Sequence, residues 1–264
     1  MNLFSDLNDY KKYILDNPFH IDLDVKLEDY GDVTTKKIHS PYRSVDKNNK
    51  IPSEVELDDL IRLHYLVRSR KVTTILEMGV GKSTIVFDHA LKKNEKDFSK
   101  FVTDNLRRSN PFECHSVDAS KEWIEKTKES YNFSKVTFHH SKAIMGTFNS
   151  RIATFYDPLP NISPDLIYLD APDQYSPAGD VRGVTTAHRD SLPMSADILA
   201  IEHFLLPGTL IVIDGRTANA RFLKTNFQRN WDYYHNKEYD QHFFILDEEP
   251  LGLYNKRQLD FISS

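Results

Sequence analysis

The chain has 264 residues, which is enough for one large α/β domain with an appendage or for two small domains. Hydrophobic residues make up 39% and charged residues 28%, as in a globular protein with a core. The net charge of −5 gives no overall basic field, which disfavours nucleic acid and anionic membranes as partners. A single cysteine, Cys114, excludes an internal disulfide and a cysteine-based zinc site.

The first 52 residues are polar, are dotted with aromatic residues and show no strong periodicity. They lack the order of a signal peptide, and the longest near-apolar run of the chain, 204–213, is broken by Pro207-Gly208. We therefore expect a cytoplasmic protein without a membrane partner. Residues 1–52 are predicted to form a partly helical N-terminal extension, with a short helix within 3–15. This extension packs on the main domain, closes over a site as a lid or forms a disordered tail, and the sequence does not decide among the three.

A predicted main domain, 53–264, begins with a helix start signal. Ser53 is followed three residues later by Glu56, the spacing of a helix N-cap with a capping glutamate. Apolar residues then recur at helical spacing as far as Leu66. This pattern predicts a helix that covers one face of a sheet just before its first strand.

A glycine turn between an apolar strand and an amphipathic helix is the strongest feature of the chain. The apolar run of residues 73–78 contains Glu77, and Gly79 and Gly81 follow before the helical pattern begins. Without a Cβ, glycines permit a tight turn and let a ligand lie against bare backbone at a helix N-terminus. The order strand, glycine turn, helix therefore predicts the opening unit of a nucleotide- or cofactor-binding sheet.

Two familiar glycine motifs fit this turn poorly. A phosphate loop needs a glycine where the chain has Leu76, and a dinucleotide fingerprint needs a small residue where it has Thr84. The pattern Glu77-x-Gly79-x-Gly81 resembles motif I of the class I S-adenosylmethionine (SAM) dependent methyltransferases, with Ser83 in place of the frequent third glycine. This resemblance implies that Glu77, Gly79, Gly81 and Ser83 surround the amino-acid end of SAM.

A second acid ends the next predicted strand. Residues 113–117 are predicted to form the second strand, which ends at Asp118. One carboxylate can accept hydrogen bonds from both hydroxyls of a ribose, and the resemblance assigns Asp118 and Ala119 to that part of SAM. Capping of the following helix is the alternative role of Asp118. After the third strand, 136–140, the sequence Ser141-Lys142-Ala143 lacks the acid or amide that the family often places there, so the adenine contact stays unassigned.

The second half of the chain repeats the pattern of apolar strand and acid. Residues 164–170 end in Asp170, a polar loop spans 174–193, a helix is predicted for 194–206, and residues 209–214 end in Asp214. Two runs within 231–247 read as an antiparallel pair. Together these elements are similar to the class I methyltransferase order. The resemblance implies a Rossmann-like α/β fold with seven mostly parallel strands, an antiparallel last strand and helices on both faces.

The resemblance places Asp170 near the transferring methyl group. His188 in the polar loop is the candidate general base, because histidine titrates near neutrality. Asp170 and Asp214 could share Mg²⁺; alternatively, Arg216 pairs with Asp214 and no metal is used. We therefore predict a SAM-dependent methyltransferase, O-directed on a small polar hydroxylated acceptor of the sugar or sugar-nucleotide type. An NAD(P)-dependent oxidoreductase and a non-catalytic binding protein with this fold are the alternatives, and the sequence leaves the oligomeric state open.

Overall fold

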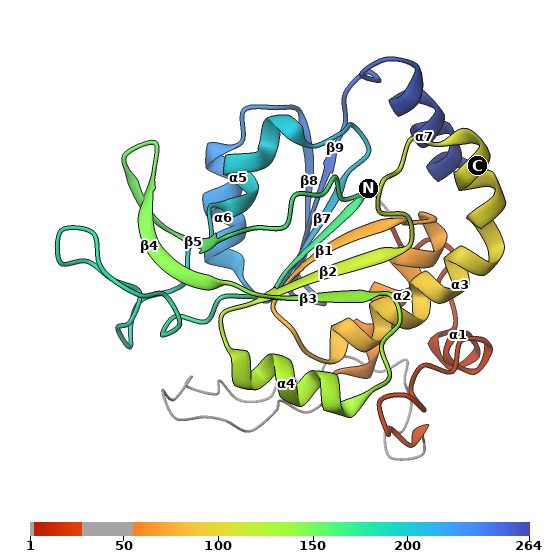
Figure 1. Ribbon diagram of the computed structural model, residues 1–264, viewed down its shortest axis with the longest axis horizontal. Helices are drawn as coiled ribbons and strands as arrows, with labels where there is room; N and C mark the ends of the chain where they lie inside the picture. Colours follow the sequence, from red (N-terminus) through yellow and green to blue (C-terminus); the bar gives the residue numbers. More distant parts are fainter. Residues whose placement is uncertain (1–2, 28–54) are drawn as a thin grey trace.

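The computed structural model describes residues 3–27 and 55–264, and Figure 1 shows a central sheet with helices around it. The sheet has seven strands in the order β3-β2-β1-β6-β7-β9-β8. In chain order these strands are β1 (Thr74–Met78), β2 (Glu113–Asp118), β3 (Val136–His140), β6 (Leu166–Leu169), β7 (Leu210–Asp214), β8 (Trp231–Asn236) and β9 (Gln241–Leu246).

One strand of this sheet is reversed. The strands β3, β2, β1, β6 and β7 pair in parallel, whereas β9 is antiparallel to both β7 and β8. Every residue of β1 and β6 is buried, as expected for parallel strands covered by helices on both faces. The predicted sheet, including its antiparallel last strand, is confirmed.

A two-stranded hairpin, β4 (Lys142–Phe148) and β5 (Arg151–Asp157), is inserted between β3 and β6. The sequence analysis did not predict it. The hairpin projects from one end of the sheet, on the left of Figure 1. Single β-bridges join Ile144 to Ala178 and Thr154 to Ser195, so the following loop is fastened to it. The polar segment after β6 is therefore partly an extension of this hairpin.

The helices are α1 (Tyr10–Asp16), α2 (Leu57–Ser69), α3 (Lys82–Asn105), α4 (Lys121–Ser130), α5 (Asp197–Ile201), α6 (Thr217–Asn226) and α7 (Leu253–Ser263). Three sequence predictions were wrong in their bounds. The helix before β1 begins after Glu56, whose side chain makes no capping hydrogen bond, and Ser53 lies outside the described residues. Residues 83–92 and 98–107, which the sequence predicts as two helices, form one continuous helix, α3. The helix predicted for 194–206 is only α5 with a short 3₁₀ turn at 202–204.

Helices cover both faces of the sheet with separate apolar clusters. On one face, α2 and α3 pack on β1, β6 and β7 together with Leu7, Ile14 and Phe19 of the N-terminal segment. On the other face, α5 and α6 cover residues of β1, β6, β7 and β9. Residues 3–27 therefore pack against the main body of the protein. No helix in the described ranges has the length and apolar character needed to cross a bilayer.

Candidate functional site

The strand tips of the sheet bring four predicted site residues into one row. Met78 pairs with Val117 and with Leu169, and Leu169 pairs with Ile213. The next residues, which are Gly79, Asp118, Asp170 and Asp214, therefore lie side by side at the carboxyl edge. We call these four residues, together with Gly81, the strand-tip site. In open α/β sheets, ligands bind at this edge, where the strand order reverses.

The two glycines of the turn have different roles. Gly79 has φ +109°, and a Cβ there would lie 2.9 Å from the Cβ of Ala171, so packing against the segment after β6 requires glycine. Gly81 has an extended φ of 178° and precedes α3. A Cβ on Gly81 would meet nothing within 4 Å. Packing therefore explains the glycine at position 79, whereas the space beside Gly81 is open and its N–H donates to Thr84 Oγ1 at 3.0 Å. Contact of either glycine with a cofactor stays a prediction.

Glu77 lies two residues before Gly79 of this row and holds the glycine turn from the inside of the protein. Its side chain is fully buried and accepts hydrogen bonds from Ser83 Oγ (2.5 Å), Thr84 Oγ1 (2.7 Å) and Ser116 Oγ (2.5 Å). Burial raises its pKa to about 7, and the three hydroxyl donors oppose that rise. Glu77 and Ser83 therefore bond to each other and order the turn. Their contact with a cofactor stays a prediction.

Asp118 lies directly beside the glycine turn. Its Oδ2 accepts the backbone N–H of Val80 at 3.0 Å, and its Oδ1 accepts that of Ser120 at 2.7 Å. Burial raises its pKa, the two N–H groups lower it, and the charge of Asp173 raises it further. Each carboxylate oxygen has a second lone pair, so Asp118 has acceptor capacity left for a diol. The adjacent Ala119 is half-buried, and its carbonyl accepts a hydrogen bond from His140 Nε2 at 3.2 Å.

Asp170 is half-exposed and pairs with Arg216. The Arg216 Nε lies 3.2 Å from Asp170 Oδ1, and the same guanidinium donates to the backbone carbonyls of Asp170 and Pro172. The structure thus pairs Arg216 with Asp170, where the sequence suggested Asp214. Asp214 Oδ2 accepts the Tyr168 hydroxyl at 3.3 Å. Because a guanidinium supplies the positive charge beside Asp170, this pair does not fit a shared Mg²⁺, and we assign no metal-dependent step to it.

The predicted base, His188, lies in the exposed part of the loop after β6. Its Nδ1 accepts the backbone N–H of Asp190 at 3.1 Å, and its carbonyl accepts Nε2 of the buried Gln174 at 2.9 Å. Gln174 therefore fixes the backbone of this loop at His188. The catalytic role of His188 stays a prediction.

Tyr156 on β5 is a candidate site residue that the sequence analysis did not name. Its side chain is only 4% exposed, and its hydroxyl has no hydrogen-bond partner among the described residues. Burial raises its pKa, and the charges of Asp118 and Arg216 act on it, which places the phenol near the strand tips. Finding it required the hairpin, because only the fold returns β5 to this edge.

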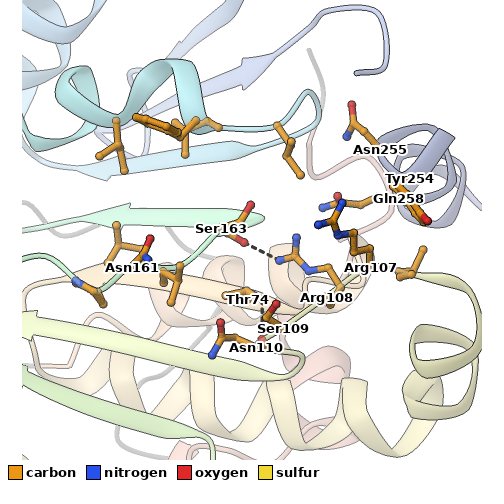
Figure 2. Close-up of a pocket in the computed structure, with 18 of the residues that line it drawn as sticks. Thr74, Arg107, Arg108, Ser109, Asn110, Asn161, Ser163, Tyr254, Asn255 and Gln258 are labelled. Carbon is orange, nitrogen blue, oxygen red and sulfur yellow. Dashed lines mark hydrogen bonds between the residues drawn. The ribbon is translucent and has the colours of Figure 1, made fainter. Parts of the chain in front are cut away.

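A large pocket of about 740 Å³ lies at the opposite, amino edge of the sheet. It is lined by Thr74, where β1 begins, by Asn110 before β2 and by Ser163 before β6. Figure 2 shows Arg108 directed toward Ser163, whose carbonyl it contacts at 2.8 Å. The same guanidinium pairs with the buried Asp165 at 2.9 Å. This pocket is therefore separate from the strand-tip site, and none of the predicted site residues lines it.

Comparison with solved structures gives several likenesses, and two of them are to methyltransferases. No family model and no curated protein matches the chain. A provisionally assigned O-methyltransferase from Klebsiella pneumoniae is 13% identical over 75% of this chain and 84% of its own, with a TM-score of 0.42. The S-adenosylhomocysteine-bound methyltransferase PaMTH1 from Podospora anserina is 13% identical over 75% and 83%, with a TM-score of 0.39. With both scores below 0.5, the fold is assigned from the strand order of the sheet itself.

The order and direction of the strands in the seven-stranded sheet decide the fold. Strands β3, β2, β1, β6 and β7 are followed by a reversed β9 that lies between β7 and β8. The chain has the Rossmann-like methyltransferase fold. An ordinary dinucleotide-binding sheet is parallel throughout, so the reversed strand separates this methyltransferase fold from the NAD(P) alternative at the level of architecture.

Proposed function

We propose that the protein is a SAM-dependent methyltransferase that acts on a hydroxyl group of a small polar acceptor, with a sugar or sugar nucleotide as the preferred class. The observation that carries this proposal is the strand-tip site. It sets the open space beside the Cα of Gly81 next to a carboxylate, Asp118, that retains free lone pairs. A nucleoside with a charged amino-acid arm needs both features, which are a diol acceptor and a helix N-terminus without side-chain obstruction.

SAM would supply an electrophilic methyl group on its sulfonium. The chain's own contribution is to hold the acceptor in line with that methyl group, and such positioning accounts for much of the rate enhancement in transfer reactions. Asp170 is the candidate to orient the acceptor, because it lies in the same row as Gly79 and is half-exposed. His188 is the candidate to remove the hydroxyl proton. The net charge of −5 supports a small acceptor over nucleic acid.

Calorimetric titration with S-adenosylhomocysteine tests the cofactor assignment. We expect saturable 1:1 binding to the full chain. We also expect Asp118→Ala to weaken it by about 1–3 kcal/mol, the typical loss for a charge-assisted hydrogen-bonding partner. Asp232→Ala, which removes an exposed acid from the edge strand β8, is the matched control and should leave the affinity unchanged.

Each outcome separates the candidate functions. Saturable binding of NADH with none of S-adenosylhomocysteine would replace the proposal with the oxidoreductase alternative. Unchanged affinity in Asp118→Ala would remove Asp118 from the site. Binding of S-adenosylhomocysteine without methyl transfer to any of a panel of hydroxylated sugars and sugar nucleotides would leave a binding protein with this fold.

A further inference from the structure

The β8–β9 hairpin gathers two imidazoles and a carboxylate that the proposed function does not use. His235 lies near the end of β8, His242 near the start of β9, and Asp240 in the turn between them. One potential ligand atom from each residue lies within 4.8 Å of the other two. In the part of the chain that the structure describes, this is the one group of at least three histidine, cysteine or acidic side chains with such convergence.

The strand register brings the two histidines together. His235 and His242 are direct cross-strand partners, so their side chains project from the same face of the sheet. Their rings lie 3.9 Å apart, with 18° between the ring planes. Asp240 has a left-handed backbone (φ 50°), and its carbonyl accepts the N–H of Gly215 at 2.9 Å. Backbone pairing and a fixed turn therefore hold all three residues.

The hydrogen bonds around the pair suit imidazole ligands. His235 Nε2 is buried and has no hydrogen-bond partner among the described residues, with Asp240 Oδ1 at 3.9 Å. The fully buried His242 meets the Tyr233 hydroxyl at Nδ1 and Thr217 Oγ1 at Nε2, both at 3.0 Å. An imidazole that binds a metal through one nitrogen normally keeps its other nitrogen bonded to an oxygen. For His242 to bind an ion, one of these hydroxyls would give up its hydrogen bond and the other would keep the ring in place, while the same ion would occupy the unsatisfied nitrogen of His235.

We propose that His235, Asp240 and His242 bind a divalent first-row transition metal ion of the Zn²⁺ type. Two imidazoles and one carboxylate suit zinc and its neighbours, whereas Mg²⁺ and Ca²⁺ prefer oxygen ligands throughout. With metal–ligand bonds of about 2.0–2.2 Å, ligand atoms on a tetrahedral ion lie roughly 3.4 Å apart. The three ligand atoms lie within 4.8 Å of one another, so they must approach by up to about 1.4 Å. The side chains of His235 and Asp240 are 24% and 42% exposed, so both can turn inward.

The site adjoins the turn between β7 and α6. Asp240 contacts Gly215 through the backbone, and His242 contacts Thr217, the first residue of α6. Arg216, which pairs with Asp170, lies between these two contacts. A bound ion would therefore tie the hairpin to the segment that holds Arg216 at the strand-tip site. The metal site does not depend on methyl transfer, because its ligands lie outside the strand-tip site.

Zinc binding by the tag-free chain of residues 1–264 tests the proposal. After removal of metals with a chelator, ZnCl₂ is titrated by calorimetry, and Co²⁺ absorption reports the coordination geometry. We expect one Zn²⁺ per chain. His235→Ala and Asp240→Asn should each weaken zinc binding by at least about 10-fold. Loss of a residue that only hydrogen-bonds to a metal ligand already costs about 10–100-fold in metal affinity. His242 is fully buried, so the test leaves it intact.

His139→Ala is the matched control. His139 also stacks on a second histidine, His115, with ring centroids 5.2 Å apart, but that pair belongs to β2 and β3. Its removal should leave zinc affinity and stoichiometry unchanged, while circular dichroism confirms that every variant is folded. Failure of the intact protein to bind one Zn²⁺, equal affinity in His235→Ala or Asp240→Asn, or loss of binding in His139→Ala would overturn the proposal.

Discussion

At the scale of single residues, the buried Glu77 gives the protein a specific dependence of stability on pH. Its pKa is raised from 4.5 to about 7 because burial disfavours the charged carboxylate. The folded protein therefore binds a proton more tightly at Glu77 than the unfolded chain does. It follows that this contribution to stability is fully present below pH 4.5 and is lost as the pH rises through about 7.

Glu77→Gln removes this titration but keeps the size of the side chain. Relative to the wild type, we expect the variant to gain about 3 kcal/mol in free energy of unfolding between pH 4.5 and pH 8, because one pKa unit corresponds to about 1.4 kcal/mol. Urea denaturation of both proteins across this range measures the difference. A constant difference at all pH values would show that Glu77 is charged throughout or that its pKa is not raised.

At the scale of elements, the turn between β1 and α3 contains two glycines. They belong to the same sequence motif, but only one of them is closely packed in the structure. Gly79→Ala places a Cβ at φ +109° and 2.9 Å from Ala171. The strained backbone alone should cost about 1–3 kcal/mol of stability, with a further cost from the overpacked contact. Gly81→Ala introduces a Cβ into open space on an extended backbone, so stability should change by less than about 1 kcal/mol.

The same pair of variants distinguishes a structural from a ligand-binding role. Gly81→Ala should weaken S-adenosylhomocysteine binding in calorimetry, because its Cβ would enter the space where the ligand approaches. Thermal unfolding should show the reverse ranking, with Gly79→Ala the less stable variant. Equal loss of stability in both, or full affinity in Gly81→Ala, would contradict this division of roles.

The elements that sequence patterns predicted well are the buried strands, whose apolar runs are unbroken. Buried strands such as β6 and β7 read as short apolar runs that end in an acid, and the parallel register then aligns Asp118, Asp170 and Asp214. The β4–β5 hairpin was missed because apolar and polar residues do not alternate clearly along β4. In the structure the residues of β4 accordingly alternate only weakly in burial. Tyr156 was therefore missed too. The pairing of Arg216 with Asp170 depends on side-chain geometry that no spacing encodes.

At the scale of the whole molecule, the N-terminal segment packs against the main body through an aromatic cluster. Phe19 is fully buried and stacks on His64 of α2, with ring centroids 4.8 Å apart. His64 in turn meets the Tyr13 hydroxyl at 2.8 Å and His89 of α3 at 2.9 Å. Two aromatic residues of the N-terminal segment thus contact the helices that cover the sheet. This packing predicts that residues 3–27 unfold together with the rest of the chain.

Phe19→Ala tests whether the segment belongs to one cooperative unit. Loss of a buried phenylalanine typically costs about 3–5 kcal/mol. Both tryptophans, Trp123 in α4 and Trp231 in β8, belong to the main body, so their fluorescence reports its unfolding in urea. A lower urea midpoint in this signal would show that the N-terminal contacts stabilise the sheet. Ile21→Ala, at a side chain that is 68% exposed, should stay within about 0.5 kcal/mol of the wild type. An unchanged midpoint in Phe19→Ala would instead make the segment an appendage that opens independently.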